Sequence, residues 1–367
     1  MTCVWKKALT ILVVSAVILC GCAKASQEPL SVGEPKNEPE NAIMTPETDT
    51  AETNSRLVIC TPHDADPMNA AITLFMSEYP DIRVEVLAAG TGELIEKLQK
   101  EAGKPSADVL WGGGADSLAA HADLFEPYIC VNDSYIDRSF KADDHTWTGE
   151  SPLPMVIIYN KKRLAAEGID APKGWQDCLK PEFKGEIAYC QPSKSGSAYT
   201  QLCTMILANG GETSGWDYVS RFVRNLDGHI FESSSKCHKM VASGDFLIGI
   251  TIEKSALTYQ DNPDIGYCYP EEGTSAVPDA ISVVKGCPDE ENAKLFVNFV
   301  TSRECQEEQS RDWERRPVRN DMKPEGSLTG LGDIRLVDYD FTWAADDKEK
   351  IIARFEEIYK EGDQTNE

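Results

Sequence analysis

The chain has 367 residues, with 61 acidic against 36 basic side chains and a formal net charge of −25. A chain of this length can bury a sizeable core and is typical of two domains. The large excess of negative charge argues against nucleic acids and anionic membrane surfaces as partners.

The first residues have the pattern of an export signal. Two lysines precede an apolar segment, residues 8–19, which is too short to span a membrane. Residues 19–22, Leu-Cys-Gly-Cys, resemble the lipobox of bacterial lipoproteins, in which a signal peptidase cuts before a cysteine that carries lipid. The resemblance implies a signal peptide over residues 1–21 and lipid attachment at Cys22. The alternative is an ordinary secretory signal followed by an unrelated cysteine.

Residues 22–55 are rich in proline and acidic side chains and contain no aromatic residue. Such a segment cannot bury enough apolar surface to fold. We therefore predict a disordered acidic tether that ends where a folded body begins, near residue 56.

The sequence contains 12 cysteines, and nine of them follow residue 55. Export permits disulfides, but nine is an odd number and the body has no C-x-x-C motif. Cys60 lies in a strand pattern and Cys203 in a helix pattern. We predict that most of the nine are buried thiols that pack as small apolar side chains. The sequence leaves open whether any two form a disulfide.

Three apolar runs near the start of the body are typical of strands. They lie within residues 57–63, 82–87 and 107–116, and helical patterns separate them at residues 66–79 and 93–103. This alternation predicts βαβ units with a parallel sheet. Ligands of such sheets bind outside the carboxyl ends of the strands, so one rim is expected to hold Thr61, Pro62, His63, Thr91 and the 112–116 loop.

The rest of the body also alternates between strand and helix patterns. A change of rhythm at residues 147–149 marks the first crossing between domains, and residues 276–284 mark the return crossing. Further strands are predicted at residues 155–159, 185–190, 229–231, 246–252, 265–269 and 281–284. Further helices are predicted at residues 198–209, 215–224, 236–243, 288–300 and 345–361.

A hydroxyl-rich loop at residues 192–199 is the strongest local feature. It follows a predicted strand and leads into a helix, where free backbone N–H groups and the helix dipole favour an anion. The alternative is ordinary capping of the helix by a serine. The loop lacks the P-loop pattern, and residues 90–92 and 112–114 lack the G-x-G-x-x-G fingerprint of a dinucleotide site.

The sequence offers no clear catalytic or metal-binding set. His63 lies at a strand end, where contact with a ligand and exposure on the surface are both compatible with the pattern. No group of histidines and cysteines has zinc-like spacing, and no nucleophile with a matching base stands out. We therefore predict neither an enzyme nor a cofactor.

Several segments together, in this order, resemble the extracellular solute-binding proteins of ABC importers, in the iron(III), thiamine and phosphonate branch. They are residues 57–63, 90–94, 107–116, 147–149, 157–160, 195–199, 277–280 and 315–319. The resemblance covers about residues 56–359. It implies a type II periplasmic-binding-protein fold, an α/β fold whose two lobes each hold a mostly parallel sheet flanked by helices, with the ligand cleft between them.

The same resemblance implies how the chain is divided and what it does. Lobe 1 is expected at residues 56–150 plus 270–305, and lobe 2 at residues 151–269 plus 306–367. The protein is expected to do no chemistry, and to capture a solute and deliver it to ABC permease subunits. We expect an exported monomer that is anchored to the cell envelope through Cys22.

The expected ligand follows from two further comparisons with that family. Its ferric-ion binders carry a tyrosine pair after the strand equivalent to residues 246–252, whereas this chain has Glu253, Lys254 and Ser255 there. Its phosphonate and phosphate binders carry a hydroxyl-rich loop like residues 193–197 and an acid near Glu253. The leading hypothesis is therefore a small organic anion that contains phosphorus: a phosphonate, a sugar phosphate or thiamine phosphate.

The resemblance also assigns roles to individual residues. The anionic group is expected at Ser193, Ser195, Gly196, Ser197 and Ala198. The remainder of the ligand is expected at His63, Thr91, Gly113, Asp116, Glu253 and Asp279. The alternative is a receptor for ferric ion or a ferric chelate that uses His63 and Glu253.

Overall fold

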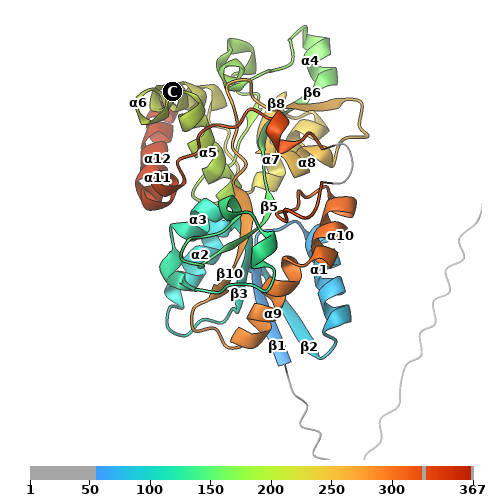
Figure 1. Ribbon diagram of the computed structural model, residues 1–367. Coiled ribbons are helices and arrows are strands. Elements are labelled where there is room, and N and C mark those ends of the chain that lie inside the picture. The colour runs from blue at the N-terminus through green and yellow to red at the C-terminus, as the bar shows by residue number, and fades with distance from the viewer. Residues whose placement is uncertain (1–54, 325–327, 365–367) are drawn as a thin grey trace, which may run out of the picture. The chain divides into compact units, whose positions relative to one another are not determined.

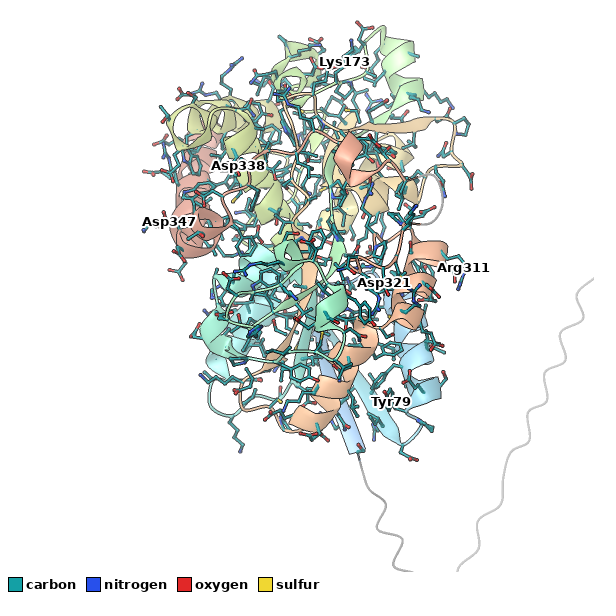
Figure 2. All side chains as sticks on the ribbon, in the orientation of Figure 1. Tyr79, Lys173, Arg311, Asp321, Asp338 and Asp347 are labelled. Atoms are coloured by element: carbon teal, nitrogen blue, oxygen red, sulfur yellow. The ribbon has the colours of Figure 1, made fainter. Side chains whose placement is uncertain are left out.

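The computed structural model describes residues 55–324 and 328–364. The predicted signal peptide, the lipid site at Cys22 and the tether lie outside the described residues. Among those residues, no helix is both long enough and apolar enough to cross a membrane. Charged side chains such as Lys173 and Arg311 project from the outside of the body (Figure 2).

The first of two sheets has the strand order β2-β1-β3-β10-β4, and β5 pairs with β10 (Figure 1). Strand β1 runs parallel to β2 and to β3, as the sequence predicts, whereas β10 is antiparallel to its neighbours. The strands are β1 (Ser55–Thr61), β2 (Ile82–Ala88), β3 (Val109–Gly114), β4 (Phe125–Glu126), β5 (Thr148–Pro152) and β10 (Pro278–Val284). Their helices are α1 (Ala65–Glu78), α2 (Thr91–Lys100), α3 (Ala115–Ala119), α9 (Glu290–Val300) and α10 (Arg303–Trp313).

The second sheet has the order β7-β8-β6-β9, and here β6 is antiparallel to both of its neighbours. Its strands are β6 (Met155–Asn160), β7 (Ile187–Ala188), β8 (Ile248–Ile252) and β9 (Ile265–Cys268). The accompanying helices are α4 (Lys161–Glu167), α5 (Gly196–Ala208), α6 (Gly211–Leu226), α7 (Ser234–Ser243), α8 (Glu253–Leu257), α11 (Phe341–Asp346) and α12 (Lys348–Gln364).

The chain crosses between the sheets from β5 to β6 and returns from β9 to β10. The two crossing segments are joined by backbone hydrogen bonds from Leu153 to Val277 (3.3 Å) and from Met155 to Ser275 (3.2 Å). The exact lobe boundaries remain a prediction.

Successive side chains of a central strand point to opposite faces of the sheet, and both faces are covered, which explains the continuous apolar runs in the sequence. Leu57 and Ile59 of β1 belong to the hydrophobic core on one face of the first sheet. Val58 and Cys60 belong to the core on the other face. A strand covered on both faces needs apolar side chains at every position.

The cysteines behave largely as predicted. All nine in the described part of the chain are free thiols, and seven of them are buried. Cys203, for example, lies in the same core as Tyr189 and Phe222. The prediction that most are buried thiols is confirmed.

Several elements differ from the sequence-based prediction; helices α4 and α8, for example, are not predicted. The last predicted helix is two helices, α11 and α12, and residues 229–231 form only an isolated bridge between Phe231 and Cys190. Helix α10 is not predicted, because its buried face is mostly polar. Gln306 donates to the Glu150 carbonyl (3.0 Å) and Gln309 to the Pro67 carbonyl (3.1 Å), so amide groups replace the usual apolar stripe.

Candidate functional site

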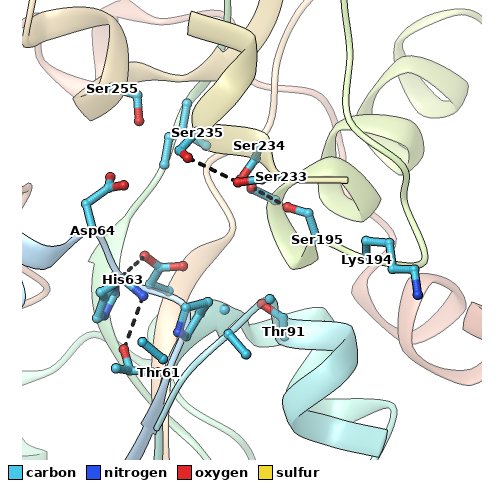
Figure 3. Close-up of a pocket in the computed structure, with 18 of the residues that line it drawn as sticks. Thr61, His63, Asp64, Thr91, Lys194, Ser195, Ser233, Ser234, Ser235 and Ser255 are labelled. Atoms are coloured by element: carbon cyan, nitrogen blue, oxygen red, sulfur yellow. Dashed lines mark hydrogen bonds and ion pairs between the residues drawn. The ribbon is translucent and has the colours of Figure 1, made fainter. Parts of the chain in front are cut away.

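A cavity of about 370 Å³ lies between elements of the two sheets (Figure 3). One side is formed by the ends of β1 and β2 and the start of α2. The other side is formed by the starts of α5 and α7 and the end of β8. Its lining residues are Thr61, Pro62, His63, Asp64, Ala65, Ala88, Ala89, Gly90, Thr91, Gly113, Lys194, Ser195, Ser197, Glu232, Ser233, Ser234, Ser235, Thr251, Ile252, Lys254, Ser255 and Asp279.

The glycines that end β3 allow its backbone to approach this rim closely. Gly112 and Gly113 have φ angles of +101° and +88°, which side chains rarely adopt. An added Cβ at Gly112 would lie 2.7 Å from the ring of His63, and one at Gly113 would lie 2.8 Å from Thr91 Cγ2. Glycine is therefore required on both backbone and steric grounds.

Four helices of ten or more residues begin at the cavity wall, and one of them, α1, starts after the acidic Asp64. Helix α2 starts after Gly90, α5 after Ser195 and α7 after Ser233. The first turn of a helix has backbone N–H groups without helical partners, and its dipole favours negative charge.

No side chain caps α2 or α7. At α7 the Lys236 N–H donates to the Ser233 carbonyl (3.1 Å), which leaves the N–H groups of Ser234 and Ser235 available to a ligand.

Hydroxyl groups add to these donors. The hydroxyls of Ser195 and Ser197 lie 3.1 Å apart at the start of α5, and those of Ser233 and Ser235 lie 3.1 Å apart at the start of α7. The α7 serines are not among the residues that the sequence nominates. The sequence does show three successive serines after an apolar segment. This segment has no glycine, unlike the loop at residues 192–199, and it was therefore not recognised as an anion site.

A buried charge cluster forms the floor beside His63. Nε2 of His63 lies 2.7 Å from a carboxylate oxygen of Glu150, and Arg315 lies 2.8 Å from the same oxygen. The indole of Trp111 donates to the other carboxylate oxygen at 2.6 Å. Burial raises the pKa of the Glu150 carboxyl, but Arg315 and His63 outweigh it and lower the value to about 2. Glu150 is thus ionised, and the sequence did not identify it.

Asp279 completes the cluster and lines the cavity. Its carboxylate lies 3.6 Å from the ammonium of Lys254 and 3.5 Å from the guanidinium of Arg315. Burial and the nearby Arg315 lower the pKa of Lys254, although Asp279 opposes them. The negative charges of the cluster are therefore already matched by cations of the protein.

Two nominated acids do not line the cavity. Asp116 accepts hydrogen bonds from the hydroxyls of Thr200 (2.9 Å) and Tyr339 (2.6 Å). Glu253 forms a buried ion pair with Arg316, with N–O distances of 2.6 and 2.7 Å. Since protein groups occupy both carboxylates, we leave them out of the proposed contact set.

The remaining nominated residues lie close by. Ser193 and Gly196 line a neighbouring cavity of about 150 Å³, and Thr91 and Ser195 line both cavities. Ala198 is buried, and its N–H donates to the Ser195 hydroxyl at 3.4 Å. The structure thus brings most of the nominated residues to one place: His63, Thr91, Gly113, Ser195, Ser197 and Asp279 line the main cavity.

One group of side chains has the donor set of a metal site. Ligand atoms of His63, Glu150 and Asp279 all lie within 4.8 Å of one another. A cation placed there would have to displace Arg315 and Lys254 from the two carboxylates. The residues present therefore fit a metal poorly.

Comparison with known proteins agrees with this geometry. Residues 105–330 match the sequence model of a family described as bacterial extracellular solute-binding protein. A Salmonella typhimurium periplasmic protein named for binding 2-aminoethylphosphonate is 27% identical over 252 residues, which are 66% of this chain and 72% of that protein.

Two solved structures are also similar. The periplasmic binding protein AfuA from Actinobacillus pleuropneumoniae, with fructose-6-phosphate bound, has a TM-score of 0.79 and 26% identity, and the match covers 84% of this chain and 99% of that one. Iron-bound HitA from Pseudomonas aeruginosa has a TM-score of 0.70 over 83% of this chain and 99% of its own, and at 18% identity it shows the fold alone.

Proposed function

This chain belongs to the family of bacterial extracellular solute-binding proteins, and we propose that it captures a small organic anion bearing a phosphate or phosphonate group. As a member of that family it binds a solute for an ABC importer and is not an enzyme. The proposal concerns the identity of the solute.

One observation carries the proposal: the starts of α2, α5 and α7 converge on a cavity that serines line. Backbone N–H groups at helix starts are well suited to phosphate oxygens, because each donates along the helix axis towards negative charge. Ser195, Ser197 and the three serines at residues 233–235 add hydroxyl donors.

The rest of the ligand is expected to meet carboxylates. Within the part of the chain that the structure describes, the side chains of Asp64 and Glu232 line the cavity and make no hydrogen bond or ion pair. Such groups suit an ammonium or a set of hydroxyls on the ligand. An aminoalkylphosphonate and a sugar phosphate, the ligand types associated with two similar proteins, both meet this requirement.

We extend the proposal to the cellular setting of the protein. Similar proteins are named as periplasmic, and we propose that this chain is exported, is lipidated at Cys22 and hands its solute to the permease as a monomer. Thiamine phosphate remains within the same proposed ligand class.

Calorimetry on the protein without its lipid provides the test. We expect 2-aminoethylphosphonate or fructose-6-phosphate to bind with one-to-one stoichiometry, and inorganic phosphate to compete with it. If none of the three produces heat or competes, the proposal is rejected.

Binding of ferric ion or a ferric chelate is a second candidate function, and the cluster of His63, Glu150 and Asp279 favours it. The cations Arg315 and Lys254 oppose it, since they neutralise both carboxylates. Metal analysis after dialysis against ferric citrate distinguishes the two. Retention of one iron per chain that His63→Ala abolishes would favour iron and contradict the phosphate proposal.

A further inference from the structure

A second large cavity adjoins the first, on the side away from Ser195. It has a volume of about 330 Å³, and Asp64, Ala65, Lys254 and Ser255 line both cavities. Figure 3 shows Asp64 and Ser255 on one side of the first cavity and Ser195 and Lys194 on the other. The two cavities therefore meet across the Asp64 and Lys254 side chains.

No bond between side chains closes this passage in the described residues. Asp64 and Lys254 do not pair with each other, and the Lys254 ammonium lies 3.6 Å from Asp279. Asp64 is exposed and its carboxylate makes no hydrogen bond, so it can change rotamer without loss. A ligand held in the first cavity has room to continue into the second.

The walls of the second cavity combine rings with charged side chains, among them Asp66, Lys239 and Arg315. Tyr259 and Trp313 line it, together with His238, which is only 5% exposed. Nδ1 of His238 lies 3.0 Å from the Tyr259 hydroxyl, but its Nε2 atom has no partner among the described residues. Burial lowers the pKa of His238 to about 4, so the ring is neutral at pH 7 and Nε2 can donate or accept one hydrogen bond.

An unpaired buried nitrogen is unfavourable unless a ligand satisfies it. We propose that the cavity lined by His238, Tyr259 and Trp313 is a second compartment of the ligand site, which receives a ring-bearing organic part of the ligand. The proposal rests on the proposed function, because the anionic group must be held at the starts of α5 and α7. Beside short ligands such as 2-aminoethylphosphonate, it adds to the ligand class phosphate or phosphonate compounds whose longer body carries a ring with a polar substituent.

Two esters of matched chain length test the second compartment separately from the first. Ethyl phosphate reaches the first cavity alone, whereas 2-phenylethyl phosphate adds one ring. We expect calorimetry to show that the phenylethyl ester binds at least about tenfold more tightly, because a ring leaves water and packs against aromatic walls.

A cavity-filling variant then assigns that gain to the second compartment. Thr258 lines the second cavity and not the first. We expect Thr258→Trp to abolish the advantage of the phenylethyl ester and to leave the affinity for ethyl phosphate unchanged. Equal affinities of the two esters in the unmodified protein, or an advantage that survives in Thr258→Trp, would overturn the inference.

A second variant keeps the inference testable if Thr258→Trp does not fold. His238→Phe keeps the aromatic volume and removes Nε2, so we expect 2-(4-hydroxyphenyl)ethyl phosphate to lose several-fold in affinity while 2-phenylethyl phosphate does not. An equal change for both esters would contradict a ligand contact at Nε2. If ethyl phosphate itself fails to bind, the proposed function fails as well, whereas failure of the compartment alone leaves ethyl phosphate bound.

Discussion

The starts of helices α5 and α7 face the same cavity but are built differently. At α5, the Ser195 hydroxyl accepts a hydrogen bond from the N–H of Ala198, so the helix satisfies one of its own donors. At α7, Ser233 caps nothing, and its hydroxyl pairs with that of Ser235. The two serine-rich segments look alike in sequence, yet at α7 no side chain takes a first-turn N–H, and the Lys236 N–H donates to the Ser233 carbonyl instead (3.1 Å).

The loop before α5 also lies in close backbone contact with the start of α2. An ideal Cβ at Gly90 would lie 2.5 Å from the Lys194 carbonyl oxygen, and one at Gly92 would lie 2.2 Å from that of Ser193. The α5 start therefore joins the two sides of the cavity. We infer that the two helix starts have different roles. The start of α5 holds the two sides of the cavity together, and the start of α7 contributes more of the free N–H donors.

The largest expected effect comes from removing one backbone donor of α7. Ser234 is the first residue of the helix, where proline is tolerated, and Ser233 has φ −130° and ψ 126°, which suits a residue before proline. We expect Ser234→Pro to weaken binding of 2-aminoethylphosphonate roughly ten- to hundredfold, the cost of a lost hydrogen bond to a charged group. Calorimetry measures this, and the thermal midpoint should not change.

A matched control is available at α10. Arg303 is the first residue of that helix and does not line the cavity. Arg303→Pro should leave the affinity intact. Unchanged binding in Ser234→Pro would show that α7 contributes no backbone donor.

The next effect concerns the contact between α2 and the α5 loop. Because a methyl group at Gly92 would overlap a backbone oxygen, Gly92→Ala should keep the two sides apart and weaken binding by about tenfold. Gly332→Ala is the control, since an added Cβ there meets nothing within 4 Å. Small-angle scattering should show Gly92→Ala more open in the presence of ligand, and a normal closed form would refute the role assigned to α2.

A smaller difference is expected in stability. Ser195→Ala removes a helix cap and should cost about 1 kcal/mol in the free energy of unfolding. Ser233→Ala removes no cap and should cost almost nothing. Urea denaturation of the two variants gives the comparison directly, and equal losses would mean that α5 and α7 are capped alike.

The smallest expected effect is a dependence of the ligand affinity on pH, which side chains can produce and backbone N–H donors cannot. Lys254 has a lowered pKa, because burial and Arg315 disfavour its charged form. A bound phosphate favours the charged form of Lys254, so the affinity should be highest below this pKa. We expect it to fall several-fold as the pH rises from about 8 towards 10.5. The phosphate is already fully ionised at about pH 8, so its own titration does not contribute. Backbone donors do not titrate, so Lys254→Met should have weaker but nearly flat binding over that range. A decline that persists in Lys254→Met would assign it to another group.

Much of the first sheet and its rim could be predicted from local sequence. Strands β1 and β3 are covered on both faces, so their apolar runs are continuous, whereas the edge strand β2 alternates apolar and charged residues. The βα connections place strand ends on one edge, which is why the rim with His63 and Thr91 could be anticipated. Helix α10 and Glu150 could not, because their polar groups are satisfied only by partners far along the chain, such as Gln306 bonding to the Glu150 carbonyl.

The sequence by itself determined the βαβ pattern of the first sheet and the position of a serine-rich helix start, because these depend on periodicity and on turns within a few residues. The family and the two-lobed fold were implied by the resemblance of several segments to solute-binding proteins. Only the tertiary structure decided which polar residues remain free for a ligand. Asp116 and Glu253 both follow strands, as binding residues often do, yet Tyr339 and Arg316 occupy them from 223 and 63 residues away. Whether a polar side chain is free is set by its neighbours in space, and that information is not local to the sequence.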